Sequence, residues 1–218
     1  MSNTSSMAER LLTQLNSLEA GETPSDGGPG DRVLLDLLHE RLALKADDQG
    51  LLDIAYRTVD SPVGPLLLAA TNRGLLRVAF EREDHDSVLE TLATKVSARI
   101  LRSPSRLDVA ARELDEYFSG KRRYFDLLLD LQLSTGFRRS VLDHLPEIRF
   151  GHTVSYAVVA DLAGSPKAVR AVGTACATNP LPLVLPCHRV VRSDGTPGAY
   201  VGGADTKLDL LKREGVVL

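Results

Sequence analysis

The 218-residue sequence has no tryptophan and only two cysteines, Cys176 and Cys187. They form no Cys-x-x-Cys pair and no Cys/His cluster with zinc-ligand spacing, so we expect neither disulfides nor a bound metal. No run approaches the ~18–20 consecutive apolar residues that span a bilayer. The start, MSNTSSMAER, lacks the basic and apolar regions of a signal peptide. These absences predict a cytoplasmic protein in a reducing compartment, without a membrane partner.

The net charge of -3 argues against a general nucleic-acid binder, but charge is distributed unevenly along the chain. Residues 1–136 contain 16 Lys and Arg against 22 Asp and Glu, a balance of -6. Residues 137–218 contain 10 against 7, a balance of +3. We therefore expect any surface that faces phosphates to lie in the C-terminal part.

Residues 1–50 are interpreted as an N-terminal appendage. They show two amphipathic helical patterns, at about 8–18 and 32–44, separated by the stretch GETPSDGGPGD, whose glycines and prolines indicate a flexible connection. The segment could be a partner-docking arm or a dispensable extension.

Residues 51–135 are expected to form a small α+β domain. Three β-like runs, at 52–58, 65–70 and 75–80, are separated by the turn sequences Ser-Pro-Val-Gly and Asn-Arg-Gly. This pattern predicts a small antiparallel sheet. Helical patterns follow at about 84–101 and 105–118.

Residues 136–218 are expected to form a mostly helical domain, with helices at 137–145, 155–163, 166–178 and 205–214. Between the second and third, Gly164 and Ser165 predict a C-cap glycine and an N-cap serine, with Pro166 at the first helical position. This arrangement indicates a helix-turn-helix. The segment NPLPLVLPCHRVVRSDG that follows is too rich in proline to form a regular helix.

Cys187 and His188 are the candidate reactive pair. A cysteine becomes a nucleophile when a neighbouring base or positive charge lowers the pKa of its thiol from about 8.5, and His188 is adjacent in sequence. The adjacency alone favours a simpler interpretation, a buried core cysteine beside an incidental histidine. Cys176 is expected to be a packed, unreactive core residue.

The sequence around this pair resembles the O6-alkylguanine-DNA alkyltransferases, also called methylated-DNA–protein-cysteine methyltransferases. The family motif Pro-Cys-His-Arg-Val stands at 186–190. The resemblance extends through VSYAVVADLAGSPKAVRAVGTACATNPLPLVLPCHRVVRSDGTPGAYVGG to KLDLLKRE, and more weakly back to residue 52. It implies an α+β fold, in which the sheet domain precedes a helical domain that contains the helix-turn-helix and the active-site cysteine.

The resemblance assigns a catalytic role to five residues. Cys187 accepts the alkyl group, His188 acts as its base through a water, and Glu214 bonds to the histidine. Asn179 braces the active-site turn, and Tyr156 contacts the guanine and can protonate the departing oxygen. From the residues alone, the favoured interpretations are a solvated partner of Lys212 or Arg213 for Glu214 and a core aromatic for Tyr156. Asn179 can also be a helix-terminal residue, and its two roles are compatible.

The helix at 166–178 is expected to contact DNA. Its periodicity places Lys167, Arg170, Ala171 and Thr174 on one face, and Val169, Val172 and Cys176 on the other. The resemblance implies that this helix, including Gly173, enters the minor groove and that Arg170 fills the space that the extruded base leaves.

The resemblance also implies a pocket for the extruded base. Its residues are Tyr156, Pro182, Val190, Tyr200, Val201 and Gly202. Two of the helix and pocket positions depart from the family pattern, since Val201 and Thr174 stand where relatives have smaller residues. Either change could narrow the pocket or alter how the helix docks.

These implications predict a monomeric DNA repair protein that binds double-stranded DNA and works without a cofactor. It would move the alkyl group of O6-alkylguanine, and also of O4-alkylthymine, irreversibly to Cys187. Two alternatives stay open. One is a lesion-binding relative without transfer activity, against which the presence of Cys187 argues. The other is a transcription regulator that uses the helix-turn-helix.

Overall fold

The computed structural model describes residues 29–216, and the chain divides into two compact units after Gln49. In the first unit, helix α2 runs from Pro29 to Asp48. It contains the helix that the sequence predicts at 32–44 and begins within the Gly/Pro-rich stretch. The other helix predicted in the appendage, at 8–18, lies outside the described residues.

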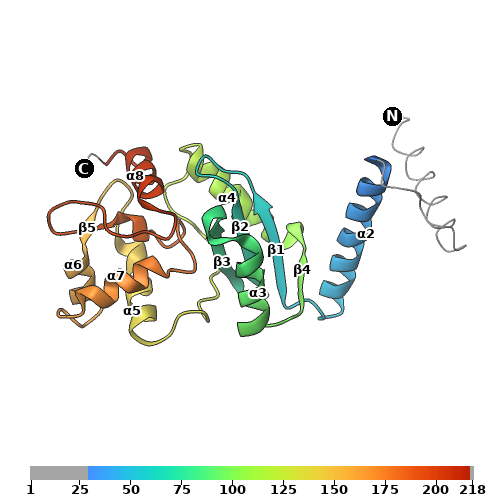
Figure 1. Cartoon of the computed structure of the whole chain (residues 1–218), viewed down its shortest axis with the longest axis horizontal. Coiled ribbons are helices and arrows are strands. Elements are labelled where there is room, and N and C mark those ends of the chain that lie inside the picture. Colours follow the sequence, from blue (N-terminus) through green and yellow to red (C-terminus); the bar gives the residue numbers. More distant parts are fainter. Residues whose placement is uncertain (1–28, 217–218) are drawn as a thin grey trace, which may run out of the picture. The chain divides into compact units, whose positions relative to one another are not determined.

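The second unit begins with a four-stranded sheet (Figure 1). Its strands, in the spatial order β3-β2-β1-β4, are β1 (Ile54–Val59), β2 (Leu66–Thr71), β3 (Gly74–Phe80) and β4 (Ile100–Arg102). Strands β1 to β3 pair antiparallel, as the sequence predicts. Strand β4 pairs parallel to β1, so the whole sheet is mixed.

The helices of the sheet domain are shorter than the sequence predicts. Helix α3 covers His85–Lys95, and the predicted helix at 84–101 is wrong at its end because Ile100 and Leu101 pair with β1. Helix α4 covers Asp108–Phe118 and follows a 3₁₀ turn, η2 (Pro104–Leu107). The sequence of residues 100–102 fits a strand or a helix equally well. These residues form a strand because the edge of β1 is available to pair with them.

The two faces of the sheet support two hydrophobic cores. Alternate residues of β2 point to opposite faces, so that Leu66 and Leu68 belong to one core and Leu67 to the other. Helix α3 covers the smaller core. Helix α4 shares the larger core with Val172 and other residues of the C-terminal helices. The sheet and the C-terminal helices are therefore packed through one continuous core.

The C-terminal part is mostly helical. Its elements are α5 (Gly136–His144), the 3₁₀ helix η3 (Leu145–Glu147), β5 (Val154–Ser155), α6 (Tyr156–Leu162), α7 (Val169–Ala177), the 3₁₀ helix η4 (Cys187–Arg189), β6 (Val190–Val191) and α8 (Ala204–Arg213). The α+β fold class is thus confirmed. Within residues 29–216, no helix is both long and apolar enough to cross a membrane.

The connection between α6 and α7 differs from the prediction. Gly164 has a φ of 72° just past the end of α6, as a C-cap glycine requires. Ser165, however, bonds back to the carbonyl of Ala160 at 2.9 Å, and its own carbonyl accepts from Ala168 N at 2.8 Å. Residues 165–168 therefore form a turn that suits Pro166 at its second position, and α7 begins at Val169 rather than at Pro166.

Candidate active site

The segment between α7 and η4 presents Cys187 on an irregular, fully buried turn. Prolines at 180, 182 and 186 prevent a helix here, and Leu183 adopts a left-handed backbone with a φ of 73°. Strand β3 holds the start of the segment, because Val78 N donates to the Pro180 carbonyl at 2.9 Å. Cys187 opens η4 with no exposed surface.

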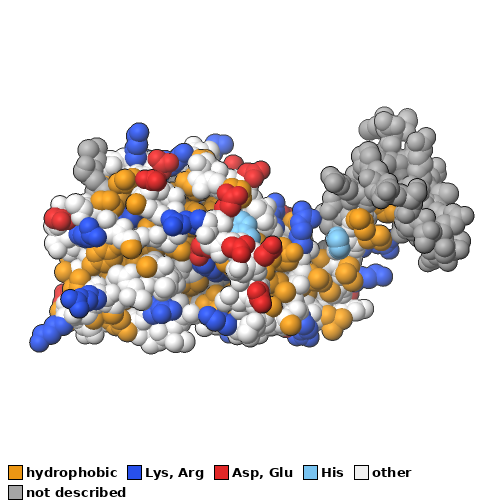
Figure 2. All heavy atoms as spheres, in the orientation of Figure 1, with side chains coloured by type: hydrophobic (Ala, Val, Ile, Leu, Met, Phe, Trp, Pro, Cys, Tyr) orange, Lys and Arg blue, Asp and Glu red, His pale blue; other side chains and the backbone are white. Residues whose placement is uncertain are grey.

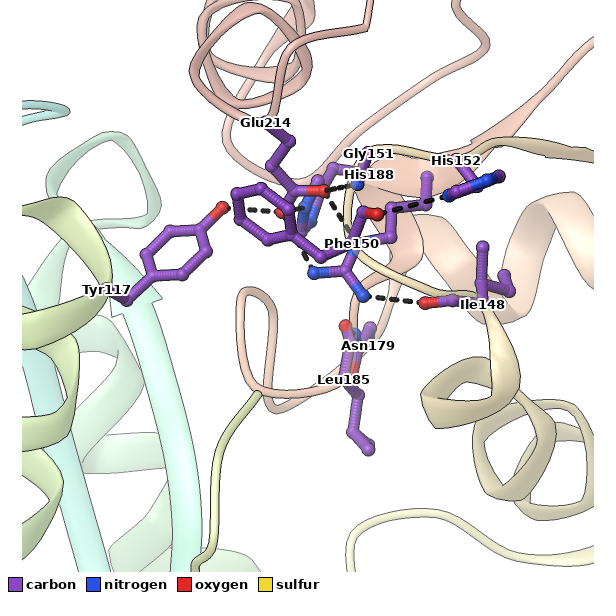
Figure 3. Close-up of polar contacts among 10 residues, drawn as sticks. Tyr117, Ile148, Phe150, Gly151, His152, Asn179, Leu185, His188 and Glu214 are labelled. Carbon is purple, nitrogen blue, oxygen red and sulfur yellow. Dashed lines mark hydrogen bonds and ion pairs between the residues drawn. The ribbon is translucent and has the colours of Figure 1, made fainter. Parts of the chain in front are cut away.

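Asn179 closes this turn by hydrogen bonds. Its Nδ2 donates to Cys187 Sγ at 3.1 Å and to the Leu185 carbonyl at 2.9 Å, while its Oδ1 accepts from Leu181 N at 2.9 Å. The side chain is fully buried and points toward Leu185 in Figure 3. One amide thus fixes both ends of the loop and contacts the sulfur, so Asn179 is more than a helix-terminal residue.

His188 is fully buried next to the cysteine and faces Glu214. The distance from its Nε2 to Glu214 Oε1 is 2.8 Å, which places the proton of a neutral ring on Nε2. Nδ1 has no hydrogen-bond partner among residues 29–216 and is therefore the nitrogen that can accept a proton.

Glu214 is the centre of the polar network behind the histidine (Figure 3). It follows the last residue of α8 and is buried, with hydrogen bonds from four other residues. Besides His188, the donors are Arg189, through Nε at 2.8 Å and Nη2 at 2.9 Å, Tyr117 Oη at 2.8 Å and Gly151 N at 3.4 Å. The interpretation of Glu214 as a solvated partner of Lys212 or Arg213 is wrong.

The environment keeps the resting thiol and imidazole neutral and Glu214 ionised. Burial raises the pKa of the Cys187 thiol to about 11, although the hydrogen bond from Asn179 acts in the opposite direction. Burial lowers the pKa of His188, against the raising effect of Glu214. Burial also favours a protonated Glu214, but the hydrogen bonds from His188 and Arg189 outweigh it and lower the pKa to about 2. The expectation of a lowered thiol pKa at Cys187 is therefore wrong.

This arrangement suits a thiol that is activated only during reaction. A neutral His188 can take the thiol proton on Nδ1, and the charge that then forms is stabilised by the ionised Glu214 on the other side of the ring. No direct hydrogen bond joins Cys187 Sγ to His188 among the described residues, since the bond to sulfur comes from Asn179. The proton must therefore travel through an intermediate group such as water.

Two family models match this chain in succession. The ribonuclease-like domain of 6-O-methylguanine DNA methyltransferase matches residues 54–131, and the DNA binding domain of the same family matches residues 136–216. A methylated-DNA–protein-cysteine methyltransferase of Methanosarcina barkeri is 39% identical over 159 residues, which cover 73% of this chain and 96% of that protein. The chain belongs to the 6-O-methylguanine DNA methyltransferase family.

Solved structures of this methyltransferase family share the fold. The crystal structure of O6-methylguanine methyltransferase from Mycobacterium tuberculosis is 35% identical, with a TM-score of 0.65, and the match covers 74% of this chain and 92% of that one. A structure of the M. tuberculosis OGT in complex with DNA matches with 36% identity and a TM-score of 0.63, covering 73% and 92%.

Helix α7, the second helix of the pair in this methyltransferase fold, has the two faces that its periodicity predicts, with two exceptions. Arg170, Ala171 and Thr174 are exposed, and Gly173 is half-buried between the faces. Val172 and Cys176 are buried. The exceptions are Lys167, which is exposed but lies on the turn before the helix, and Val169, which is 38% exposed rather than packed. Both follow from the later start of α7.

The residues of the expected base pocket are mostly buried, and Tyr156, Val190 and Tyr200 belong to the same hydrophobic core as Cys187. Tyr156, Pro182, Val190, Tyr200 and Gly202 are buried, and Val201 is half-buried. Tyr156 packs so closely on Gly198 that an added Cβ there would lie 2.1 Å from the tyrosine hydroxyl. Burial raises the pKa of Tyr156 to about 12, so its hydroxyl is protonated and able to donate.

Four residues of the site are not among the site residues that the sequence predicts. Arg189 pairs with Glu214, and Tyr117 approaches the same carboxylate from α4. Lys207 is fully buried in α8, where its Nζ donates to the Val190 carbonyl at 2.6 Å. Arg77 donates from Nη1 to the Asn179 carbonyl at 3.4 Å and to the Pro180 carbonyl at 3.0 Å, and also pairs with Glu83. Arg189 had a signal in its place in the Pro-Cys-His-Arg-Val motif, and Lys207 in its place at the start of the matched segment KLDLLKRE.

On the face that Figure 2 shows, basic and acidic side chains are interspersed over the second unit. The excess of basic residues in the C-terminal part therefore does not form one large positive patch on this face. Contacts with DNA on this face would depend on individual residues rather than on the electrostatic field of a large positive patch.

Proposed function

We propose that this protein repairs DNA directly by moving the alkyl group of O6-alkylguanine to Cys187. Membership of the 6-O-methylguanine DNA methyltransferase family supports the reaction class. The observation that carries the proposal is the arrangement at η4, where the fully buried Cys187 lies next to His188 and His188 Nε2 is hydrogen-bonded to Glu214. The acceptor is part of the protein, so each molecule reacts once.

The chemistry balances without a cofactor. Cys187 loses its proton toward His188 Nδ1, and the sulfur displaces guanine from the alkyl carbon. An S–C bond forms and the C–O6 bond breaks. The departing oxygen is stabilised by the Tyr156 hydroxyl, and a proton returns to the base at N1, which gives ordinary guanine. The thiol proton is thus transferred, in net terms, to the base.

We propose that the lesion reaches Cys187 only after extrusion from the duplex. The sulfur has no exposed surface, and a base inside an intact stack cannot bring its O6 substituent to a buried atom. The near-complete burial of Tyr156 and Tyr200 adds a second requirement, because the pocket must open locally to admit the base. Extrusion costs a few kcal/mol, which contacts with the DNA must offset.

The DNA-facing surface is proposed to be the exposed face of α7. Arg170, Ala171 and Thr174 combine one positive charge with small side chains, which suits close approach to the minor groove. We propose that residues 136–218 carry both DNA binding and the acceptor cysteine, that residues 51–135 form the sheet domain and that residues 1–50 are an appendage. The protein would act as a monomer, and O4-alkylthymine would be a second substrate.

The decisive experiment is to incubate the protein with duplex DNA that contains O6-methylguanine and to measure the mass of the product. We expect one methyl group per protein molecule and none after incubation with unmodified duplex. Trypsin leaves both cysteines on one peptide, because no Lys or Arg lies between Arg170 and Arg189. Fragmentation of this peptide should place the methyl group on Cys187.

Two single-cysteine variants form a matched pair for this assay. Cys187→Ser should bind the modified duplex without becoming methylated, whereas Cys176→Ser should react like the unmodified protein. Absence of methylation in the unmodified protein would overturn the proposed function. Lesion binding without transfer would favour a recognition protein, and equal binding of modified and unmodified DNA would favour a regulator.

A further inference from the structure

The sheet domain contributes Tyr117 to the polar network around Glu214. Tyr117, in the last turn of α4, lies 97 residues before Glu214, and its hydroxyl donates to Glu214 Oε1 at 2.8 Å. This is the same oxygen that faces His188 Nε2 at 2.8 Å. Figure 3 shows Tyr117 reaching Glu214 from the opposite side of the network from His152. Glu214 Oε1, which also accepts from Arg189 Nη2 at 2.9 Å, therefore accepts from both the phenol and the imidazole.

The ring of Tyr117 is held by aromatic packing that does not involve its hydroxyl. Its centroid lies 5.3 Å from that of Phe118, 5.5 Å from Phe125 and 6.4 Å from Phe150. The side chain is buried. Phenylalanine would fill the same space, so the hydroxyl is not required for packing. What the hydroxyl adds is a donor at a fixed position beside Glu214.

We propose that Tyr117 is a positioning residue for alkyl transfer, which orients Glu214 and moderates how strongly that carboxylate stabilises a protonated His188. The proposal rests on the proposed function, because it concerns the same base. A hydrogen bond from Tyr117 to Glu214, the partner of His188, fixes the orientation of the Glu214 carboxylate and reduces its basicity. The sheet domain would then be a working part of the reaction rather than a scaffold.

The groups around Glu214 determine whether loss of the Tyr117 hydroxyl raises or lowers the pKa of His188. Without the phenol, Glu214 Oε1 would accept more strongly from His188, so the pKa of the imidazole would rise and more of it would be protonated before reaction. A protonated His188 cannot take the thiol proton. Among residues 29–216, the titratable or charged groups that face Glu214 and His188 are Tyr117, Cys187, Arg189, Tyr200 and Lys207, and Arg213 lies near Tyr117.

The test compares Tyr117→Phe with Tyr124→Phe, a matched change at a tyrosine that is 75% exposed. The rate of methyl transfer from O6-methylguanine duplex is measured across pH in single-turnover reactions. Tyr117→Phe should lower the highest rate by about an order of magnitude and move the acid limb of the profile to higher pH. Tyr124→Phe should leave both unchanged.

Two further variants separate positioning from folding. Replacement of Tyr117 by 3-fluorotyrosine keeps the ring and strengthens the donor, so the acid limb should move to lower pH, opposite to the shift in Tyr117→Phe. In a Glu214→Gln background, Tyr117→Phe should have little further effect on the rate, because the group through which Tyr117 acts is gone. Melting temperatures show whether each variant is folded at the assay temperature.

The outcomes distinguish this inference from the proposed function. If the unmodified protein transfers no methyl group, the proposed function fails. If it transfers methyl but Tyr117→Phe changes only the melting temperature, with an unmoved pH profile, Tyr117 is structural and the inference is wrong. If Tyr117→Phe is unfolded, the 3-fluorotyrosine variant decides, and an acid limb that does not move would overturn the inference.

Discussion

Asn179 Nδ2 donates a hydrogen bond to Cys187 Sγ at 3.1 Å, and this is the one side-chain hydrogen bond to the sulfur among the described residues. A donor at this distance favours the thiolate over the thiol. It opposes the effect of burial, which raises the pKa of the thiol to about 11. Asn179 therefore stabilises the species that attacks the alkyl carbon.

Replacing Asn179 should slow transfer without preventing DNA binding. Asn179→Ala removes the donor to sulfur and the support of Leu185 and Leu181, so we expect the single-turnover rate to fall by about 10- to 100-fold. Asn179→Asp should be slower still, because a negative charge would disfavour the thiolate. The measurement is methyl transfer under conditions where DNA binding is saturated. Asn72→Ala, in an exposed turn, is the control and should react normally.

Acid stability should depend on Glu214. Its folded-state pKa of about 2 lies below the ordinary 4.5, so ionised Glu214 stabilises the fold above pH 4.5 and this contribution is lost as pH falls toward 2. The shift corresponds to about 3 kcal/mol at most. Glu214→Gln should be clearly less stable at pH 7, where it leaves the buried Arg189 without its partner, and the difference should shrink between pH 5 and pH 2.

Urea denaturation at several pH values measures this difference. The control is Glu147→Gln, because the Glu147 side chain is 56% exposed and pairs with His144 at the surface. Its stability should follow that of the unmodified protein at every pH. A constant difference between Glu214→Gln and the unmodified protein from pH 7 to pH 2 would show that Glu214 is not ionised in the fold.

Local pattern predicted most of the secondary structure, and tertiary contacts explain the exceptions. The strands at 54–80 and the helices α5, α6 and α8 lie within a few residues of their predicted bounds. Strand β4 was missed because its pairing with β1 joins residues about 46 positions apart, which no local periodicity records. The late start of α7 was missed because Ser165 closes α6 instead of capping α7.

The candidate site likewise combines residues that the local sequence identifies with residues that only the fold brings together. Cys187, His188 and Asn179 lie within ten residues of one another, in the segment NPLPLVLPCHRVVRSDG that carries the family resemblance. Tyr117 lies outside every segment quoted for the resemblance, and only the fold brings it to the site. The pKa of Cys187 could not be deduced from its neighbour in sequence, because complete burial has a larger effect than any adjacent base.

Arg77 should couple the sheet domain to the reactive turn. Its guanidinium bonds to the carbonyls of Asn179 and Pro180, next to the side chain that contacts Cys187. Arg77→Leu removes these hydrogen bonds and the ion pair with Glu83, while Val78 N still donates to the Pro180 carbonyl, so we expect a loss of about 1–3 kcal/mol in unfolding free energy and slower transfer. Arg77 and Lys95 line the same surface cavity, but Lys95 is exposed, so Lys95→Leu should change neither. Normal transfer by Arg77→Leu would remove this coupling.

Arg170 should affect the repair of duplex DNA rather than the chemical step of alkyl transfer. It is exposed on α7, and no hydrogen bond or ion pair among residues 29–216 joins its side chain to the Cys187 network, so its replacement removes no direct contact to the thiol. If its side chain occupies the space that the extruded base leaves, Arg170→Ala should slow repair of duplex DNA while leaving reaction with the free base O6-methylguanine near normal. Both rates are measured on the same preparation.

The comparison with Arg170→Lys separates charge from shape. Lysine keeps the positive charge and the attraction to phosphates, so a purely electrostatic role predicts a normal duplex rate for this variant. Arginine also stacks on bases through its planar guanidinium, which lysine lacks. We expect Arg170→Lys to bind duplex nearly as well as the unmodified protein but to repair it more slowly. Equal losses on duplex and free base would instead place Arg170 in the chemistry of the site, which contradicts its position on the exposed face.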